Sequence, residues 1–127
     1  MRDTGLWHPR LAALVAGLGH TETIVVADAG LPVPPGVEVV QLAVTRGLPS
    51  LPAVLKAIAG DLVVEAATVA TDLTDASVLD CVRLLGVPVE AVGHEELKQR
   101  CRDARAVVRT GDTTPYANVI LRAGVSF

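Results

Sequence analysis

The fold is decided by residues 19–32, Gly-His-Thr-Glu-Thr-Ile-Val-Val-Ala-Asp-Ala-Gly-Leu-Pro. Their centre, residues 23–28, predicts a strand that is apolar almost throughout, which is typical of a strand covered on both faces of a sheet. His20 stands just before this strand and Asp28 closes it. Histidine titrates nearest to neutral pH, and a carboxylate at the end of a buried strand needs a polar partner. With the Gly-Leu-Pro turn that follows, the two side chains are expected to form one wall of a small polar site.

Segments typical of strands and helices alternate along the rest of the chain. Apolar residues recur every three or four positions in four segments, which therefore predict helices. These helices cover residues 9–18, Ser50 to Gly60, Asp72 or Thr74 to Gly86, and 94–104. Further strands are predicted over residues 37–44, 62–70, 88–92, 106–109 and 117–121.

This alternation indicates an α/β fold, a three-layer α/β/α sandwich around a mostly parallel sheet. No helix separates the last two predicted strands, so one of them is expected to run antiparallel and make the sheet mixed. The chain shows no internal repeat and no linker long enough to divide it. A single domain over residues 1–127 is therefore expected.

The composition narrows the class of protein. Half of the 127 residues are apolar, but the only aromatic residues are Trp7, Tyr116 and Phe127, so the core must be aliphatic. A mean hydropathy of +0.46 in so short a chain indicates more apolar surface than one small core covers, which favours a homo-oligomer. The net charge of −3 argues against a nucleic-acid partner, which would select a basic face.

A membrane location is not expected. No segment reaches the about 18 consecutive apolar residues that a membrane span needs. Residues 11–18 are too short and too interrupted for the core of a signal peptide. Cys81 and Cys101 are isolated and fall at apolar positions of predicted helices, as thiols do in a reducing compartment. The chain is expected to be cytoplasmic.

Familiar cofactor and catalytic motifs are absent. Residues 17–19 read Gly-Leu-Gly without the third glycine of a dinucleotide-binding turn, and no Gly-Lys-Ser/Thr follows. The histidines at 20 and 94 have neighbouring glutamates, but not at the His-Glu-x-x-His spacing of a zinc site. No Gly-x-Ser-x-Gly elbow occurs. Chemistry without a cofactor or metal is therefore expected.

What remains is a set of acid–base and hydrogen-bonding residues at the ends of predicted strands, where small ligands bind in open α/β sheets. They are His20, Asp28, His94, Lys98, Asp112, Tyr116 and Asn118. Tyr116 and Asn118 alternate on a predicted strand, so both side chains should project to one face.

Each of these residues also has a purely structural interpretation. His20 could face solvent after a helix, and Asp28 could bond a backbone N–H of the following loop. His94 and Lys98 lie one turn apart and could be an ordinary surface pair. Asp112 is expected to be a plain turn residue. Glu65, conspicuous in an apolar strand, is expected to be a structural partner of a buried arginine or of the backbone.

Several short motifs, in order along nearly the whole chain, resemble the D-ribose pyranase family. They are Gly19-His20-Thr21, Asp28-Ala29-Gly30-Leu31-Pro32, Thr45-Arg46-Gly47-Leu48-Pro49, Val64-Glu65-Ala66, Arg109-Thr110-Gly111-Asp112, Pro115-Tyr116-Ala117-Asn118 and Ala123-Gly124-Val125-Ser126-Phe127. The sister family of L-fucose mutarotases shares the histidine and the Tyr-x-Asn ending but departs at residues 28–32. Residues 71–92 look shorter than in some relatives, and His8 matches no family pattern.

The resemblance implies an isomerase that interconverts the β-pyranose and β-furanose forms of D-ribose without a cofactor. It also implies a ring-shaped homo-oligomer such as a decamer of two pentamers. His20 would correspond to the proton donor of the family. Asp28, His94 and the segment Tyr116-Ala117-Asn118 would correspond to its sugar-binding residues. Lys98 joins this set because it shares a predicted helix face with His94.

A regular strand over residues 23–28 would place His20 and Asp28 about 17–20 Å apart, at about 3.3 Å per residue. A monosaccharide is too small to bridge that gap. Either the loops fold back along the sheet, or neighbouring subunits each contribute part of the site. We favour the second, which also explains the apolar excess. Two other functions stay open: a mutarotase for another sugar such as L-fucose, and a non-catalytic ribose-binding accessory protein of a sugar transporter.

Overall fold

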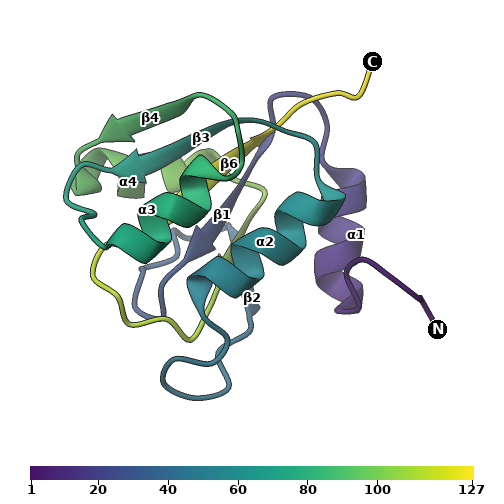
Figure 1. The fold of residues 1–127 in the computed structure, drawn as a ribbon, viewed down its shortest axis with the longest axis horizontal. Helices are drawn as coiled ribbons and strands as arrows, with labels where there is room; N and C mark the ends of the chain where they lie inside the picture. Colours follow the sequence, from purple (N-terminus) through teal and green to yellow (C-terminus); the bar gives the residue numbers. More distant parts are fainter.

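The structure, a computed structural model that describes residues 1–127, is a six-stranded sheet flanked by helices (Figure 1). In chain order the strands are β1 Thr23–Ala27, β2 Glu38–Gln41, β3 Val64–Ala70, β4 Val89–Val92, β5 Ala106–Arg109 and β6 Val119–Ala123. The helices are α1 Pro9–Gly17, α2 Leu51–Asp61, α3 Ala76–Arg83 and α4 His94–Arg100, which continues as a 3₁₀ turn over Cys101–Asp103.

The sheet is mixed, as predicted. Its strand order is β2-β5-β1-β6-β3-β4. β2, β5 and β1 run parallel to one another, β3 and β4 are also parallel, and β6 runs antiparallel to both β1 and β3. The last strand of the chain therefore joins the two parallel parts of the sheet, with Val26 of β1 paired to Val108 of β5 on one side and Val119 of β6 on the other.

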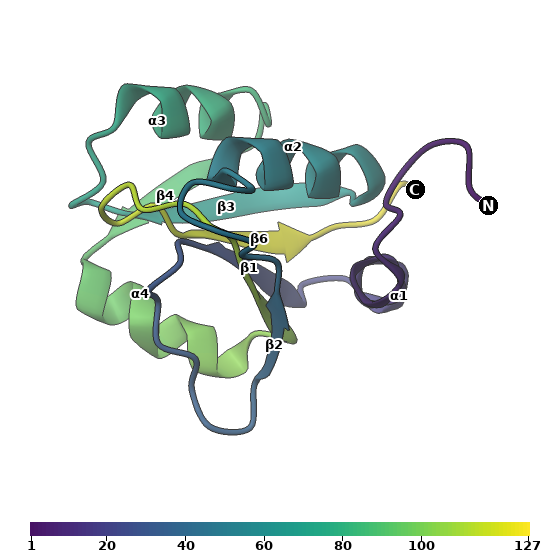
Figure 2. The same cartoon turned by 90° about the horizontal axis from the view of Figure 1, so that it is seen from below.

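Helices cover both faces of the sheet, which gives the predicted three layers (Figure 2). α2 and α3 lie over one face and α4 over the other, while α1 lies beside one end of the sheet. The apolar run of β1 serves both faces: Ile24 and Val26 belong to the larger buried cluster with α1, α2 and α3, and Val25 and Ala27 to the smaller one with α4. A strand apolar on both sides is what such a central position requires.

Three helices begin at side chains that accept hydrogen bonds from the free backbone N–H groups of the first turn. The His8 Nδ1 accepts from the Leu11 N–H before α1. The Ser50 hydroxyl accepts from the Ala53 N–H before α2, as predicted. For α3 the predicted start at Asp72 or Thr74 is wrong, because the cap is Asp75, whose carboxylate accepts from the Val78 N–H. Asp72 instead accepts a hydrogen bond from the His94 N–H at the start of α4.

Two strand predictions need correction. The strand predicted over residues 37–44 is limited to β2, because its neighbour β5 has only four residues to pair with it. The Leu42 N–H still donates to the Arg109 carbonyl, and the chain then turns away. The strand predicted over residues 117–121 lies two residues later, as β6, because its pairing with β1 and β3 begins at Val119.

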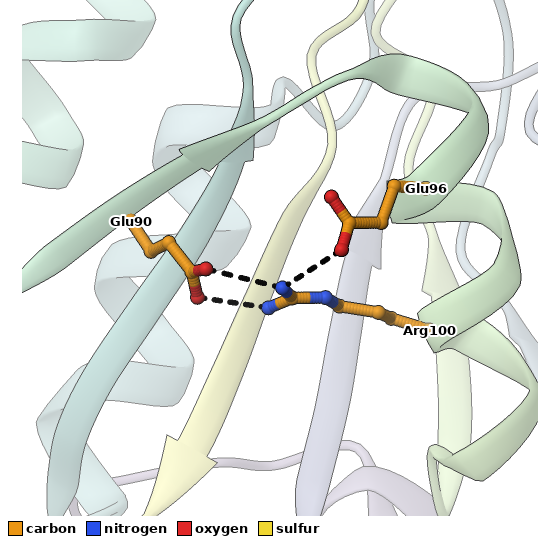
Figure 3. A network of polar contacts seen from close by, with 3 residues as sticks. All are labelled: Glu90, Glu96 and Arg100. Atoms are coloured by element: carbon orange, nitrogen blue, oxygen red, sulfur yellow. Dashed lines mark hydrogen bonds and ion pairs between the residues drawn. The ribbon is translucent and has the colours of Figure 1, made fainter.

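An ion-pair network attaches α4 to the edge strand β4 (Figure 3). The guanidinium of Arg100 donates two hydrogen bonds to Glu90 at 2.8 and 3.1 Å and one to Glu96 at 3.1 Å. These bonds hold the pKa of Arg100 above its usual value and that of Glu90 below it. Because the groups are partly exposed, the network orients α4 over the sheet more than it stabilises the fold.

No helix of the structure combines the length and apolar composition that crossing a membrane requires.

Candidate functional site

Asp28 is fixed at the end of β1 by Asn118, which comes immediately before β6. The Asn118 carbonyl oxygen accepts from the Asp28 N–H at 2.9 Å, and its amide nitrogen donates to the Asp28 carboxylate at 3.3 Å. The other carboxylate oxygen accepts from the Gly30 N–H at 3.0 Å. This bond to the following loop is the structural role that the sequence suggested for Asp28. Asn118 has no exposed surface, so its main effect is to hold Asp28 in place.

The loop after β5 supports this arrangement through Thr110 and Asp112, both buried. The Thr110 hydroxyl donates to the Ala27 carbonyl at 2.8 Å, and the two Asp112 carboxylate oxygens accept from the N–H groups of Leu51 and Thr114 at 2.8 Å. Asp112 therefore does more than a plain turn residue, because it joins the first residue of α2 to the loop beside Asp28.

Asp28, His94 and Tyr116 line a shallow pocket of about 320 Å³ at this end of the sheet. The rings of His94 and Tyr116 lie edge to face, with centroids 5.0 Å apart. The prediction that Tyr116 and Asn118 project to one face of a strand is wrong. Tyr116 sits in a turn at φ +59° with 39% of its surface exposed, whereas Asn118 is fully buried. Because Tyr116 lies in this turn and not on a strand, its phenol lines the pocket and does not project from a face of the sheet.

His94 lines the pocket with its side chain, and one of its ring nitrogens is buried. Its backbone N–H donates to Asp72, and its buried Nδ1 has no hydrogen-bond partner within the chain. Lys98 lies one turn further along α4, but its ammonium pairs with Glu95 at 2.9 Å and does not line the pocket. Ala117 is buried between Tyr116 and Asn118, so only its backbone could meet a ligand.

His20 lies at the opposite end of β1 from this pocket. The turn before the strand is held by the Glu22 carboxylate, which accepts from the Gly19 N–H at 2.7 Å, and by the Thr21 N–H, which donates to the Ala123 carbonyl. The His20 imidazole Nε2 lies 3.0 Å from a carboxylate oxygen of Glu65. Within one chain, therefore, His20 and Asp28 do not form one wall of a site, because the length of β1 separates them.

The family follows from comparison with known proteins. The RbsD / FucU transport protein family matches residues 1–126. The chain belongs to this family.

Its relatives in this family cover its whole length. A D-ribose pyranase of Rubrobacter xylanophilus is 51% identical over 130 residues, and one of Coprothermobacter proteolyticus is 45% identical over 131 residues, each aligned over all of both chains. The structure of Bacillus subtilis RbsD complexed with D-ribose matches with a TM-score of 0.95 at 40% identity, again over all of both chains. FucU of Bifidobacterium longum, at 22% identity over 94% of each chain with a TM-score of 0.80, shares the fold.

Two residues of the His20 end were not assigned to the site from the sequence. Glu65 was expected to be a structural partner, and it does pair with an arginine: its second carboxylate oxygen forms an ion pair with the Arg122 Nε at 2.7 Å. Arg122 is half-exposed instead of buried, and Glu65 also bonds His20. A carboxylate in an apolar strand is the signal for such a partner, but nothing in the sequence indicates which residue it meets.

In this RbsD / FucU family member the pocket residues suit a polyhydroxylated ligand. Asp28 offers carboxylate acceptors, His94 a ring nitrogen and Tyr116 both a hydroxyl and an aromatic face. No group of three or more histidine, cysteine, aspartate or glutamate side chains comes together as metal ligands would. The arrangement can bind sugar hydroxyls and exchange protons with them.

Proposed function

We propose that this chain interconverts the β-pyranose and β-furanose forms of D-ribose by acid/base-catalysed ring opening and closing. The observation that carries the proposal is the pocket of Asp28, His94 and Tyr116, found in a chain that aligns end to end with D-ribose pyranases. The fold of RbsD in its D-ribose complex supports the same substrate.

The reaction needs two proton-transfer groups. To open the pyranose, the C1–O5 bond of ribose breaks and its electron pair stays on O5, which takes a proton from the His20 imidazolium. The anomeric hydroxyl gives its proton to the Asp28 carboxylate, and C1 becomes an aldehyde carbon. To close the furanose, O4 attacks C1 and returns a proton to His20, while Asp28 returns its proton to the carbonyl oxygen. Each positioned transfer contributes about 10²–10⁴-fold.

The remaining residues bind the sugar. His94 forms a hydrogen bond to a sugar hydroxyl through its ring, and Tyr116 packs on the sugar or bonds it through its hydroxyl. Asn118 and the backbone of Ala117 complete the wall behind Asp28. Lys98 is proposed as a further contact, one turn along α4 from His94.

The two halves of the site come from neighbouring subunits in this proposal. One subunit's His20 end meets the next subunit's Asp28 end, a head-to-tail contact that closes into a ring. Apolar residues available for such a contact stand at both ends: Val125 and Phe127 are exposed beyond β6 near His20, and Tyr116 is exposed beside Asp28. A decamer of two pentameric rings is the proposed assembly.

We also propose that the protein works in the cytoplasm, because Cys81 and Cys101 are free thiols, as expected in a reducing compartment.

Saturation-transfer NMR on ribose tests the function, by measuring exchange between the anomeric signals of the pyranose and furanose forms. The protein should accelerate this exchange, and His20→Ala should abolish it while ribose binding is retained. His8→Asn is the matched control, because His8 only caps α1 and asparagine caps a helix equally well. Ribose binding without exchange would favour a binding protein, and faster exchange of L-fucose anomers would favour a mutarotase.

A further inference from the structure

Glu65 links His20 to Arg122 at the end of the sheet opposite the pocket. One oxygen of its carboxylate lies 3.0 Å from His20 Nε2, and the other forms an ion pair with Arg122 Nε at 2.7 Å. The carboxylate is therefore held on both sides, and only 29% of the Glu65 side chain is exposed. The imidazole is the more exposed partner, at 54%, and its Nδ1 has no hydrogen-bond partner within the chain.

A β-bulge directs Glu65 toward His20. On β3, Val64 pairs with Ala123 of β6 and Ala66 pairs with Arg122, so Glu65 is the extra residue between two consecutive partners. A bulge of this kind changes the direction of one side chain while the flanking residues keep their register. The neighbouring backbone also leaves room for Glu65, since a Cβ placed on Gly124 would lie 2.9 Å from the Glu65 Cβ.

The charge of Glu65 decides which nitrogen of His20 carries a proton. The hydrogen bond with His20 and the nearby Arg122 hold the pKa of Glu65 below its usual value, so the carboxylate is ionised near neutral pH. An ionised carboxylate can only accept hydrogen bonds. The Nε2 of His20 must then be the donor, both in the neutral imidazole and in the imidazolium.

We propose that Glu65 is a positioning residue that keeps a proton on His20 Nε2, so that Nδ1 is the atom that exchanges a proton with the sugar. Arg122 in turn orients Glu65. This inference rests on the proposed function of His20. In the imidazolium the Nδ1–H gives its proton to O5 as the C1–O5 bond breaks, and on closure Nδ1 takes the proton of O4. The Nε2 proton stays in place throughout, as it does when a carboxylate orients a catalytic histidine.

The tautomer can be observed without any turnover. Long-range ¹H–¹⁵N correlation on protein labelled with ¹⁵N-histidine distinguishes Nε2–H from Nδ1–H rings at neutral pH, and the signals missing from His20→Asn identify residue 20. We expect the Nε2–H form in the wild-type protein. We expect a mixture of both forms in Glu65→Ala. A wild-type His20 in the Nδ1–H form would overturn the inference.

Ribose exchange by the same variants tests the consequence. Glu65→Ala should lower kcat about 10- to 100-fold, part of the about 10²–10⁴-fold that a positioned acid or base contributes, with a much smaller change in KM. Glu65→Gln, which keeps an acceptor oxygen but not the charge, should restore part of the rate. A merely structural Glu65 would lower thermal stability in Glu65→Ala and leave both the tautomer and kcat of the folded protein unchanged.

Glu38→Gln is the matched control, because Glu38 also pairs with an arginine, Arg10, but on β2 and away from both halves of the site. It should keep the wild-type kcat. If Glu65→Ala retains the wild-type kcat in a protein that exchanges ribose forms, this inference alone fails. If the wild-type protein exchanges no ring forms, the proposed function fails and this inference fails with it.

Discussion

Asn118 shows how a buried residue can serve a pocket that it barely touches. Both polar atoms of its side chain bond Asp28, one through the backbone N–H and one through the carboxylate. Its own surface is fully covered. The position of the Asp28 carboxylate at the end of β1 therefore depends on the side-chain amide of Asn118, the residue that immediately precedes β6.

Replacing Asn118 with alanine should weaken both the fold and ligand binding. The Asp28 N–H would lose its acceptor, and an unsatisfied amide costs about 1–3 kcal/mol of unfolding free energy. Urea unfolding measures that loss, and a ribose titration should show weaker binding because the carboxylate is no longer held. Gln99→Ala is the matched control: it truncates an exposed amide on α4 and should change the unfolding free energy by less than about 0.5 kcal/mol. Equal stability of the two variants would contradict the account.

At the residue level the sequence indicated which side chains are polar and near strand ends, but not which of them meet. Asp28 and Asn118 are 90 positions apart in the sequence, and His20 and Glu65 are 45 apart. Their pairing depends on the order of the strands in the sheet and on a one-residue bulge in β3. Neither feature leaves a periodic pattern in the sequence.

The elements of the fold were predicted better than their ends. β5 was predicted correctly at Ala106–Arg109, and the apolar run of β1 correctly indicated a strand covered on both faces of the sheet. Where a predicted strand boundary was wrong, the neighbouring strand determines the observed one. The length of β5 limits β2, and pairing with β1 and β3 sets the start of β6. Hydrophobic periodicity reports burial, which continues into flanking turns such as the one that contains Ala117.

Asp112 joins the start of α2 to the loop that follows β5, and replacing it should destabilise both. Burial alone would raise the pKa of Asp112, but hydrogen bonds from Leu51 and Thr114 outweigh it and hold the pKa below its usual value. A lowered folded-state pKa stabilises the protein at pH values above the unfolded pKa, about 3.9, and this stability is lost as the pH falls through the folded pKa. Asp112→Asn should therefore cost about 1–3 kcal/mol of unfolding free energy at pH 7.

The stability difference between wild type and Asp112→Asn should begin to shrink below about pH 4 and vanish as the pH falls through the lowered folded-state pKa of Asp112, where the wild-type carboxyl also becomes neutral. Urea unfolding at pH 7 and pH 3 measures both values. Asp80→Asn is the control, since Asp80 makes an exposed ion pair with Arg83 and bonds no helix N-terminus. A difference that stays constant over this pH range would show that the charge of Asp112 does not contribute.

For the whole molecule, the separation of His20 from Asp28 predicts complementation between two inactive variants. His20→Ala and Asp28→Asn should each abolish ribose exchange. When co-expressed in equal amounts they should recover about a quarter of the wild-type activity, because about one site in four receives both intact halves from different subunits. Co-expression of His20→Ala with Glu65→Ala is the control and should recover much less, since both changes affect the same half of the site.

If the mixed sample stays inactive while both variants form mixed oligomers, the site belongs to one chain and the proposed assembly is wrong. Mass spectrometry of the intact oligomers establishes whether mixing has taken place.

The position of β6 has a consequence for how the protein is made. This strand is the last to be synthesised, yet it lies between β1 and β3 and is the only connection between the two parallel parts of the sheet. Domains usually begin to fold during translation, from the N-terminus onward. Here the two parts can be joined only once β6 has left the ribosome, so the five strands that precede it in the chain cannot complete the sheet without it.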